Sequence, residues 1–441
     1  MQSDRPFHPE RRSLVGLPTC IALVVANMIG TGVFTSLGFQ LRDLYSPFII
    51  LIVWILGGIF ALCGALCYAE LAATIPRSGG EYHFLGKIYH PALGFMAGMV
   101  SLVAGFAAPT ALAAIAFGKY LQDVFPGIPL RETSLILVTV VTATHLVSTR
   151  LSGAFQTIIT VTKIALIAVF LIAGFCLMRQ HEPISFHPPP RTWQIFFSPA
   201  FAVSLMFAMF SYSGWNAATY IIEEVRSPEK NVGRALLIGT LFVTFLYVLL
   251  NATFLLAAPA TALENQLDVG RIASEYIFGK FGGVSVSGLI CLGIIASVSA
   301  MTWAGPRVGA AMGEDHWNLQ WLATRSSTGV PWVASLFQFL IVILLLSTAS
   351  FEVVLIYAQF ALVACSLLTS LGVIVLRKTQ PHLPRPFKCW LYPIPPLLFC
   401  AISVFTLIYS ALHKPWESLA GTGTLLVFVA VYFIMKKLHK K

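Results

Sequence analysis

The chain has 441 residues, of which 57% are hydrophobic and only 10% are charged, and its mean hydropathy is +0.81. Soluble domains carry about 25% charged residues, so this composition excludes a soluble globular protein and predicts one that crosses a membrane many times. The net charge of +10 does not require a nucleic-acid partner, because the distribution of basic residues along the chain accounts for it.

Twelve segments are predicted to span the membrane, since a span needs about 20 mostly apolar residues. The first lacks the cleavage site of a signal peptide and is interpreted as a span, and the fourth is short. We therefore predict an all-α polytopic membrane protein with spans at 14–40, 47–75, 92–121, 134–149, 154–177, 195–224, 235–258, 283–312, 331–349, 353–376, 391–412 and 417–435.

Twelve spans place both termini on one side of the membrane, and basic residues indicate which side. With a cytoplasmic N-terminus, 18 of the 28 Lys and Arg residues lie in cytoplasmic segments and 8 in outer segments, while Lys163 and Arg307 lie within spans. This asymmetry predicts cytoplasmic termini in a plasma membrane or bacterial inner membrane. The eight cysteines form no pair in an outer loop, and we expect no disulfide framework, metal site or cofactor.

Gly30-Thr31-Gly32 interrupts the first span within VANMIGTGVFTS (25–36), and Ser211, Ser213 and Gly214 interrupt the sixth. Backbone groups freed at a helix break are tolerated in a membrane only where they line a polar cavity. The half-helix after a break presents N–H groups that suit a carboxylate, and the half-helix before it presents carbonyls that suit an ammonium. Two facing breaks predict a site for a zwitterion, whereas one alone would fit close helix packing.

The two interruptions lie five spans apart, and an odd offset inverts a repeat in the membrane, as in transporters built from inverted repeats. The predicted organisation is a cytoplasmic tail (1–13), two five-helix repeats (14–177 and 195–376), helices 11 and 12 (391–435) and a second tail (436–441). The repeats share no convincing residue identity, so this prediction depends on spacing.

Several motifs resemble those of the amino acid–polyamine–organocation (APC) superfamily. IGTGVF (29–34) is similar to its first-span signature, AELAATIPRSGGEYHFL (69–85) to its first inner loop, and FSYSGWNAATYIIEEVRSPEKNVGRAL (210–236) to the L-type amino acid transporter branch. The resemblance implies a LeuT-like fold with broken helices 1 and 6. It implies a substrate carboxylate against the N–H groups of Thr31, Gly32 and Val33 and an ammonium against carbonyls near Ile29 and in 210–213. The implied substrate-binding residues are Ile29, Gly30, Thr31, Gly32, Val33, Phe210, Ser211, Ser213, Gly214 and Asn216, with Phe210 also a gate.

Lys163 lies ten residues past Gly153, which is about 15 Å along a helix, and a charge at that depth is usually functional. The resemblance implies that Lys163 takes the place of a sodium ion between the first-span break and the eighth span, near Ser297 and Ser299. This favours sodium-independent transport. Protonation of Lys163 would permit proton symport and a permanent charge would suit an exchanger, and both remain open.

The other charges are predicted to be structural. Glu70, Arg77 and Glu81 are expected to face Glu223, Glu224 and Arg226 in an inner gate network, and a solvated cytoplasmic face is an equal alternative. No Asp or Glu lies in the middle of a span, which favours a neutral amino acid as substrate. The alternatives are an APC carrier for cationic amino acids or polyamines and a transporter-like amino acid sensor.

An enzyme is not expected, because His145, the only histidine well inside a span, has no carboxylate nearby in the sequence. The resemblance also raises the question of a partner, since animal L-type light chains join a heavy chain through a cysteine between spans three and four. QDVFPGIPLRET (122–133) contains none, so a disulfide-linked heavy chain is not expected.

Overall fold

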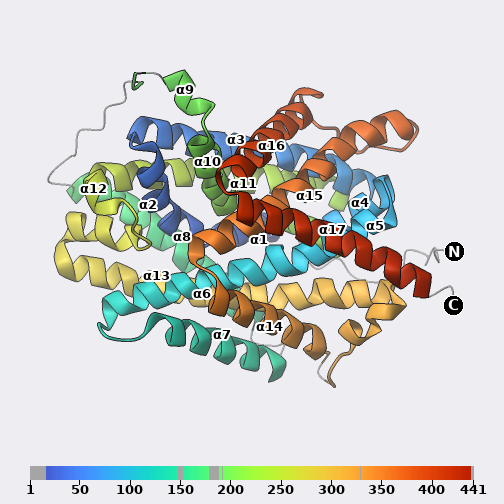
Figure 1. Cartoon of the computed structure of the whole chain (residues 1–441), viewed down its shortest axis with the longest axis horizontal. Coiled ribbons are helices and arrows are strands. Elements are labelled where there is room, and N and C mark those ends of the chain that lie inside the picture. The colour runs from blue at the N-terminus through green and yellow to red at the C-terminus, as the bar shows by residue number, and fades with distance from the viewer. Residues whose placement is uncertain (1–15, 148–151, 178–187, 191, 328, 439–441) are drawn as a thin grey trace.

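The computed structural model describes residues 16–147, 152–177, 188–190, 192–327 and 329–438, and these form helices and no strands (Figure 1). The helices are α1 (Leu17–Met28), α2 (Gly32–Leu44), α3 (Pro47–Thr74), α4 (Glu81–Ile88), α5 (Pro91–Val100), α6 (Ala108–Val124), α7 (Leu130–Val147), α8 (Ser152–Leu177), α9 (Thr192–Phe196), α10 (Pro199–Tyr212), α11 (Pro228–Ala257), α12 (Ala260–Leu263), α13 (Val269–Asp315), α14 (Trp332–Thr348), α15 (Phe351–Thr379), α16 (Ile394–His413) and α17 (Pro415–Leu438). A π-helical turn, η1 (Ser101–Ala107), joins α5 to α6, and η2 (Ala217–Tyr220), η3 (Ile222–Glu224) and η4 (Trp317–Ala323) are 3₁₀-helical.

Within the described residues, eight helical segments are long and apolar enough to cross a membrane, and three shorter apolar helices accompany them. The chain is therefore an integral membrane protein. The segment 17–44 counts as one span although it consists of α1 and α2, and 91–124 joins α5, η1 and α6. The shorter apolar helices lie in α8, α10 and α14.

The observed helices differ from the predicted spans at several places. α13 begins at Val269 and not near residue 283, and its backbone leaves the helical range at Gly279 (φ 76°). The short helices α4, α9 and α12 were not predicted, because each lies wholly or mostly between two predicted spans. Both predicted tails lie outside the described residues, except for 436–438 at the end of α17.

Serine and proline set the start of several helices. The hydroxyl of Ser46 accepts a hydrogen bond from the N–H of Ile49, and that of Ser198 accepts one from Phe201. Each serine is followed by proline, whose missing N–H and fixed φ suit the first helical position. Ser-Pro therefore starts α3 and α10 at defined residues, which fixes the depth of the break that follows α10.

The largest buried cluster joins α1, α2, α3, α10 and α11. Helices α7 and α14 lie together along one edge of the molecule (Figure 1), and α16 packs against α3 and α10. Leucines of α17 such as Leu419 and Leu426 are more than half exposed, as expected for a helix that faces lipid. The broken segments thus lie in the interior of the molecule.

Candidate functional site

The first helix break separates α1 from α2. α1 ends at Met28, the N–H of Gly30 turns back to the carbonyl of Met28 (2.8 Å), and α2 begins at Gly32. Thr31 precedes α2 without a side-chain cap. Because the first N–H groups of a helix have no intrahelical acceptor, the backbone N–H groups of Gly32 and Val33 face the break.

The second break follows α10. Ser213 leaves the helix with an extended ψ of 146°, and Gly214 has a φ of +98°, which L side chains rarely adopt. The N–H of Ser213 donates to the carbonyl of Phe210 (2.9 Å) and the N–H of Ala217 to that of Gly214 (3.0 Å). The next carbonyls of α10, those of Ser211 and Tyr212, accept no backbone hydrogen bond from a described residue beyond the helix.

The two breaks are in direct contact. A Cβ added to Gly32 would lie 2.6 Å from the Oγ of Ser211 and 2.8 Å from its Cα. A Cβ added to Gly214 would lie 2.7 Å from the carbonyl oxygen of Asn27, near the end of α1. The hydroxyls of Ser36 and Ser211 are 3.1 Å apart and join the two segments further. Glycine is therefore required at both breaks for close approach, and at Gly214 for its backbone conformation as well.

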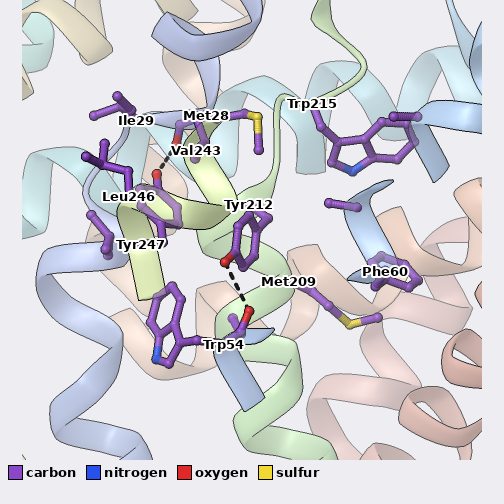
Figure 2. Packing of buried hydrophobic residues seen from close by; sticks show 14 of the residues in the cluster. Met28, Ile29, Trp54, Phe60, Met209, Tyr212, Trp215, Val243, Leu246 and Tyr247 are labelled. Carbon is purple, nitrogen blue, oxygen red and sulfur yellow. Dashed lines mark hydrogen bonds between the residues drawn. The ribbon is translucent and has the colours of Figure 1, made fainter. Parts of the chain in front are cut away.

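Buried tyrosines of the surrounding bundle hold the first break in place. The hydroxyl of Tyr247 on α11 donates to the carbonyl of Met28 (2.6 Å), and that of Tyr212 donates to the carbonyl of Trp54 on α3 (3.0 Å), as Figure 2 shows. The indole of Trp54 in turn donates to the side chain of Gln40 on α2 (2.9 Å). The hydroxyl of Tyr247 thus adds a second donor, beside the N–H of Gly30, to the carbonyl of Met28 at the end of α1.

A cavity of about 580 Å³ extends from the two breaks to one end of the molecule. We call it the central cavity. It reaches the exposed Arg77 in the loop after α3 and Asp315 at the end of α13. At the breaks it is lined by Gly30, Thr31, Gly32, Phe210, Ser211, Ser213, Gly214 and Asn216. The structure thus brings these predicted substrate-binding residues to one cavity, while Ile29 and Val33 are buried beside it.

Phe210 is 7% exposed and forms part of the cavity wall at the end of α10. Trp215 also touches the cavity, but its ring packs edge-on against Tyr68 with centroids 4.7 Å apart, and against Phe399 of α16. Trp215 therefore anchors the second break to α3 and α16.

Lys163 of α8 lies beside the first break. Its Nζ donates to the carbonyl of Ile29 (3.3 Å) and to the hydroxyl of Ser297 on α13 (2.6 Å). A small void of about 20 Å³ adjoins the ammonium and is lined mainly by apolar side chains. The ammonium therefore joins α8, α13 and the broken first segment.

The prediction that Ser299 also lies near Lys163 is wrong. Its hydroxyl is 2.8 Å from Nε2 of His145 on α7. Residues 297 and 299 are two positions apart on one helix, so their side chains point in different directions. This contact also gives His145 a structural partner.

The structure does not join the six predicted gate residues in one network. Glu70 is 2% exposed and accepts two hydrogen bonds from Arg377 (2.8 and 2.6 Å) and one from the N–H of Cys389 (2.7 Å). It thus ties α3 to the end of α15, because these segments converge there. Arg77 lies 3.6 Å from Asp315 at the end of α13.

On the other side of the expected network, the N–H of Glu223 donates to the hydroxyl of Ser78 (3.1 Å). Arg226 is exposed, and the side chain of Glu224 lies outside the described part of the structure. The described contact between the two loops is therefore made by backbone and hydroxyl groups. A gating role for these residues stays a prediction.

Glu81, at the start of α4, belongs to the buried wall of the central cavity. It is 2% exposed and accepts hydrogen bonds from the hydroxyls of Tyr68 and of Ser366 (2.8 Å). Burial raises its pKa, since desolvation disfavours the charged form. Burial, together with the charge of Arg77, lowers the pKa of the neighbouring His83 to about 4, so this imidazole is neutral at pH 7.

The sequence analysis did not single out the walls contributed by helices without a break. Phe106, Met301 and Gln359 all line the central cavity. Each belongs to a long apolar segment in which many residues of the same type are lipid-facing or packed. Gln359 carried the only usable signal, as an uncharged polar side chain within an apolar helix.

The chain matches the family model for amino acid permeases over residues 15–432. It is 31% identical over 443 residues to the large neutral amino acids transporter small subunit 2 of Mus musculus, covering 95% of this chain and 80% of the relative. It is 28% identical over 446 residues to the b(0,+)-type amino acid transporter 1 of Homo sapiens, covering 98% and 90%. The resemblance inferred from the motifs is thereby confirmed, and the chain belongs to the amino acid permease family of the APC superfamily.

Proposed function

We propose that this protein is a secondary active transporter that moves neutral L-amino acids across the plasma or bacterial inner membrane by alternating access. The observation that carries the proposal is the contact between the two helix breaks at the head of the central cavity. The N–H groups of Gly32 and Val33 suit a carboxylate, because the start of a helix favours negative charge. The carbonyls of Ser211 and Tyr212 suit an ammonium.

Of the carbonyls predicted to bind the ammonium, two already have partners. That of Ile29 is in contact with Lys163, and that of Phe210 accepts the N–H of Ser213. The proposed ammonium site therefore lies at Ser211 and Tyr212.

We propose twelve spans in a LeuT-like arrangement, formed by the eight long segments, the three shorter apolar helices and α7. The two five-helix units would end at α8 and α15. The two breaks support this arrangement, since they occur in the first helix of each unit.

The described conformation supports an inward-facing state. On the side of the breaks opposite to the cavity mouth, the ring of Phe39 stacks between those of Phe207 and Phe351, with centroids 5.2 and 5.9 Å away. Arg42 pairs with Glu352 (3.0 Å) beyond this stack. With cytoplasmic termini, as the basic residues predict, the mouth near Arg77 would open to the cytoplasm and the aromatic stack would seal the outer side.

Lys163 supports sodium-independent transport, because its ammonium already supplies a positive charge between the first break and α13. Exchange and proton symport both remain compatible with this contact. The loop between α6 and α7 contains no cysteine, which supports a carrier without a disulfide-linked heavy chain.

A carrier for cationic amino acids or polyamines is the second candidate, and Glu81 is the observation that favours it. This buried carboxylate in the cavity wall would attract a cationic side chain. Two hydroxyl groups already donate to it, so the neutral substrate remains the main proposal.

Counterflow into proteoliposomes tests the function. Vesicles that contain the purified protein are loaded with one unlabelled amino acid, and entry of labelled leucine, threonine and lysine is measured with and without a pH gradient. Entry that requires internal substrate supports exchange, and accumulation driven by the pH gradient alone supports proton symport. Preferred entry of lysine would favour the second candidate. Binding without entry would contradict transport and favour a sensor.

A further inference from the structure

Gln359 of α15 is a buried polar side chain beside the second break. It is 4% exposed, and the hydroxyl of Ser213 donates to its Oε1 at 3.4 Å. The same hydroxyl shares its one hydrogen with the carbonyl of Met209 (3.2 Å), one turn back in α10. The amide of Gln359 therefore lies at the end of α10, where the ammonium site is proposed.

The other half of this amide has no protein partner among the described residues. The contact with Ser213 is its only hydrogen bond there, and the residue lines the central cavity. An amide has two donor hydrogens and an acceptor oxygen. Whichever way the amide is turned, one end contacts Ser213 and the other is left for an occupant of the cavity.

The surrounding cavity wall is mostly apolar. One face of α15 lines the cavity with residues at the spacing of successive helical turns. These residues are Gln359, Leu362, Val363 and Ser366. Opposite contributions come from Phe106 and Pro109 of the third span and from Met301 and Ala304 of α13. An amide in such a wall discriminates among side chains of similar size, because an apolar side chain would leave the amide unpaired.

We propose that Gln359 is a specificity-determining residue, which selects neutral amino acids whose side chains carry a hydroxyl or amide group over apolar amino acids of the same shape. The inference rests on the proposed function and deepens it. The substrate class is threonine, serine, asparagine and glutamine. The backbone charges of the substrate bind at the two breaks, and its side chain extends along α15 toward the amide.

The size of the effect is bounded by the chemistry. A site built around a buried hydrogen-bonding group rejects analogues that lack the matching group much more strongly than an apolar pocket rejects a missing methylene. The central cavity reaches exposed residues at one end, so water weakens this discrimination. We expect about a tenfold preference, equivalent to about 1.4 kcal/mol.

Competition between isosteric pairs tests the inference. Uptake of labelled threonine into proteoliposomes is measured against unlabelled valine, and that of glutamine against methionine, for the wild type and for Gln359→Met. The matched control is Gln338→Met on α14, which removes another buried glutamine (2% exposed) that donates to the carbonyl of Met301 (3.2 Å) and does not line the cavity.

We expect the wild type to prefer the polar member of each pair, and Gln359→Met to reduce that preference about tenfold while valine uptake is retained. Gln338→Met should keep the wild-type preference. An unchanged preference in Gln359→Met would mean that Gln359 only supports Ser213. An equal loss of uptake for the polar and the apolar amino acid of a pair would mean that Gln359 acts on the charged backbone groups that all amino acids share. Either result overturns the inference.

The wild type alone provides a second measurement if Gln359→Met does not fold. Valine taken up better than threonine by the wild type would also overturn the inference and leave the proposed transport of neutral amino acids intact. Absence of amino acid entry into wild-type vesicles would instead overturn the proposed function, and the inference with it.

Discussion

The two helix breaks are built from small residues of the same kind, yet they leave opposite groups unpaired. At the first break, the hydroxyl of Tyr247 and the ammonium of Lys163 contact the carbonyls of Met28 and Ile29. The N–H groups at the start of α2 remain without an intrahelical acceptor. At the second break, the N–H of Ser213 is bonded within the chain, and the last carbonyls of α10 remain.

The polarity of each break therefore depends on side chains that are distant in sequence. Helix geometry leaves donors at the start of one helix and acceptors at the end of the other. Tyr247 and Lys163, which lie 219 and 134 residues from the carbonyls they contact, occupy the acceptors of the first break. An anion is thereby favoured at one break and a cation at the other.

The largest expected effect is that of Gly32→Ala, which separates the two breaks. Alanine normally stabilises a helix relative to glycine by about 1 kcal/mol, but here its Cβ would lie 2.8 Å from the Cα of Ser211. Overpacking costs about 1–3 kcal/mol, and each 1.4 kcal/mol corresponds to a factor of ten. We expect counterflow to fall about 100-fold.

The matched control is Gly423→Ala on α17, where an added Cβ meets nothing within 4 Å. This variant should retain wild-type counterflow and melting temperature. Full transport by Gly32→Ala would mean that the breaks separate without loss, and the proposed two-break site would then be wrong.

Lys163→Ala tests the first break alone and should have the second-largest effect. It removes two hydrogen bonds, to Ile29 and Ser297, each with a net worth of about 1 kcal/mol. We expect counterflow to fall about 10- to 100-fold and any dependence on a pH gradient to disappear. Lys280→Ala, at an exposed lysine next to the Gly279 kink, is the control. Wild-type, pH-dependent transport by Lys163→Ala would contradict the coupling role.

The sequence predicted the two breaks because glycine and serine are conspicuous in an apolar helix, and Lys163 because a charge at that depth is costly. It did not predict that Glu70 would pair with Arg377 of α15. Charged residues at helix ends have many partners within reach, and only the folded arrangement selects one. The helical turns from Val269 to Phe278 were not predicted either. They lie before the apolar span that begins near residue 283, and they join it only through the kink at Gly279.

Tyr247→Phe should have an intermediate effect, because it removes one of the two donors to the buried carbonyl of Met28 and leaves only the N–H of Gly30. One buried hydrogen bond is worth up to about 1.5 kcal/mol. We expect a lower melting temperature and about a tenfold loss of counterflow. Tyr212→Phe removes a similar bond, to the carbonyl of Trp54, and leaves the bond between Tyr247 and Met28 in place. It should lower the melting temperature comparably but reduce transport less. Equal losses of transport would mean that Tyr247 acts only through general stability.

The smallest expected losses of transport come from substitutions of two serines on α13, and they differ between the two residues. Ser297→Ala removes one hydroxyl partner of Lys163 at 2.6 Å, and a single hydrogen bond is worth about 1 kcal/mol, so counterflow should fall about fivefold. Ser299→Ala loses only the contact with His145 and should stay within about twofold of the wild type. A larger effect at Ser299 than at Ser297 would contradict the assignment of Ser297 to the lysine site. In that case the support of the first break would have to extend through His145 to α7.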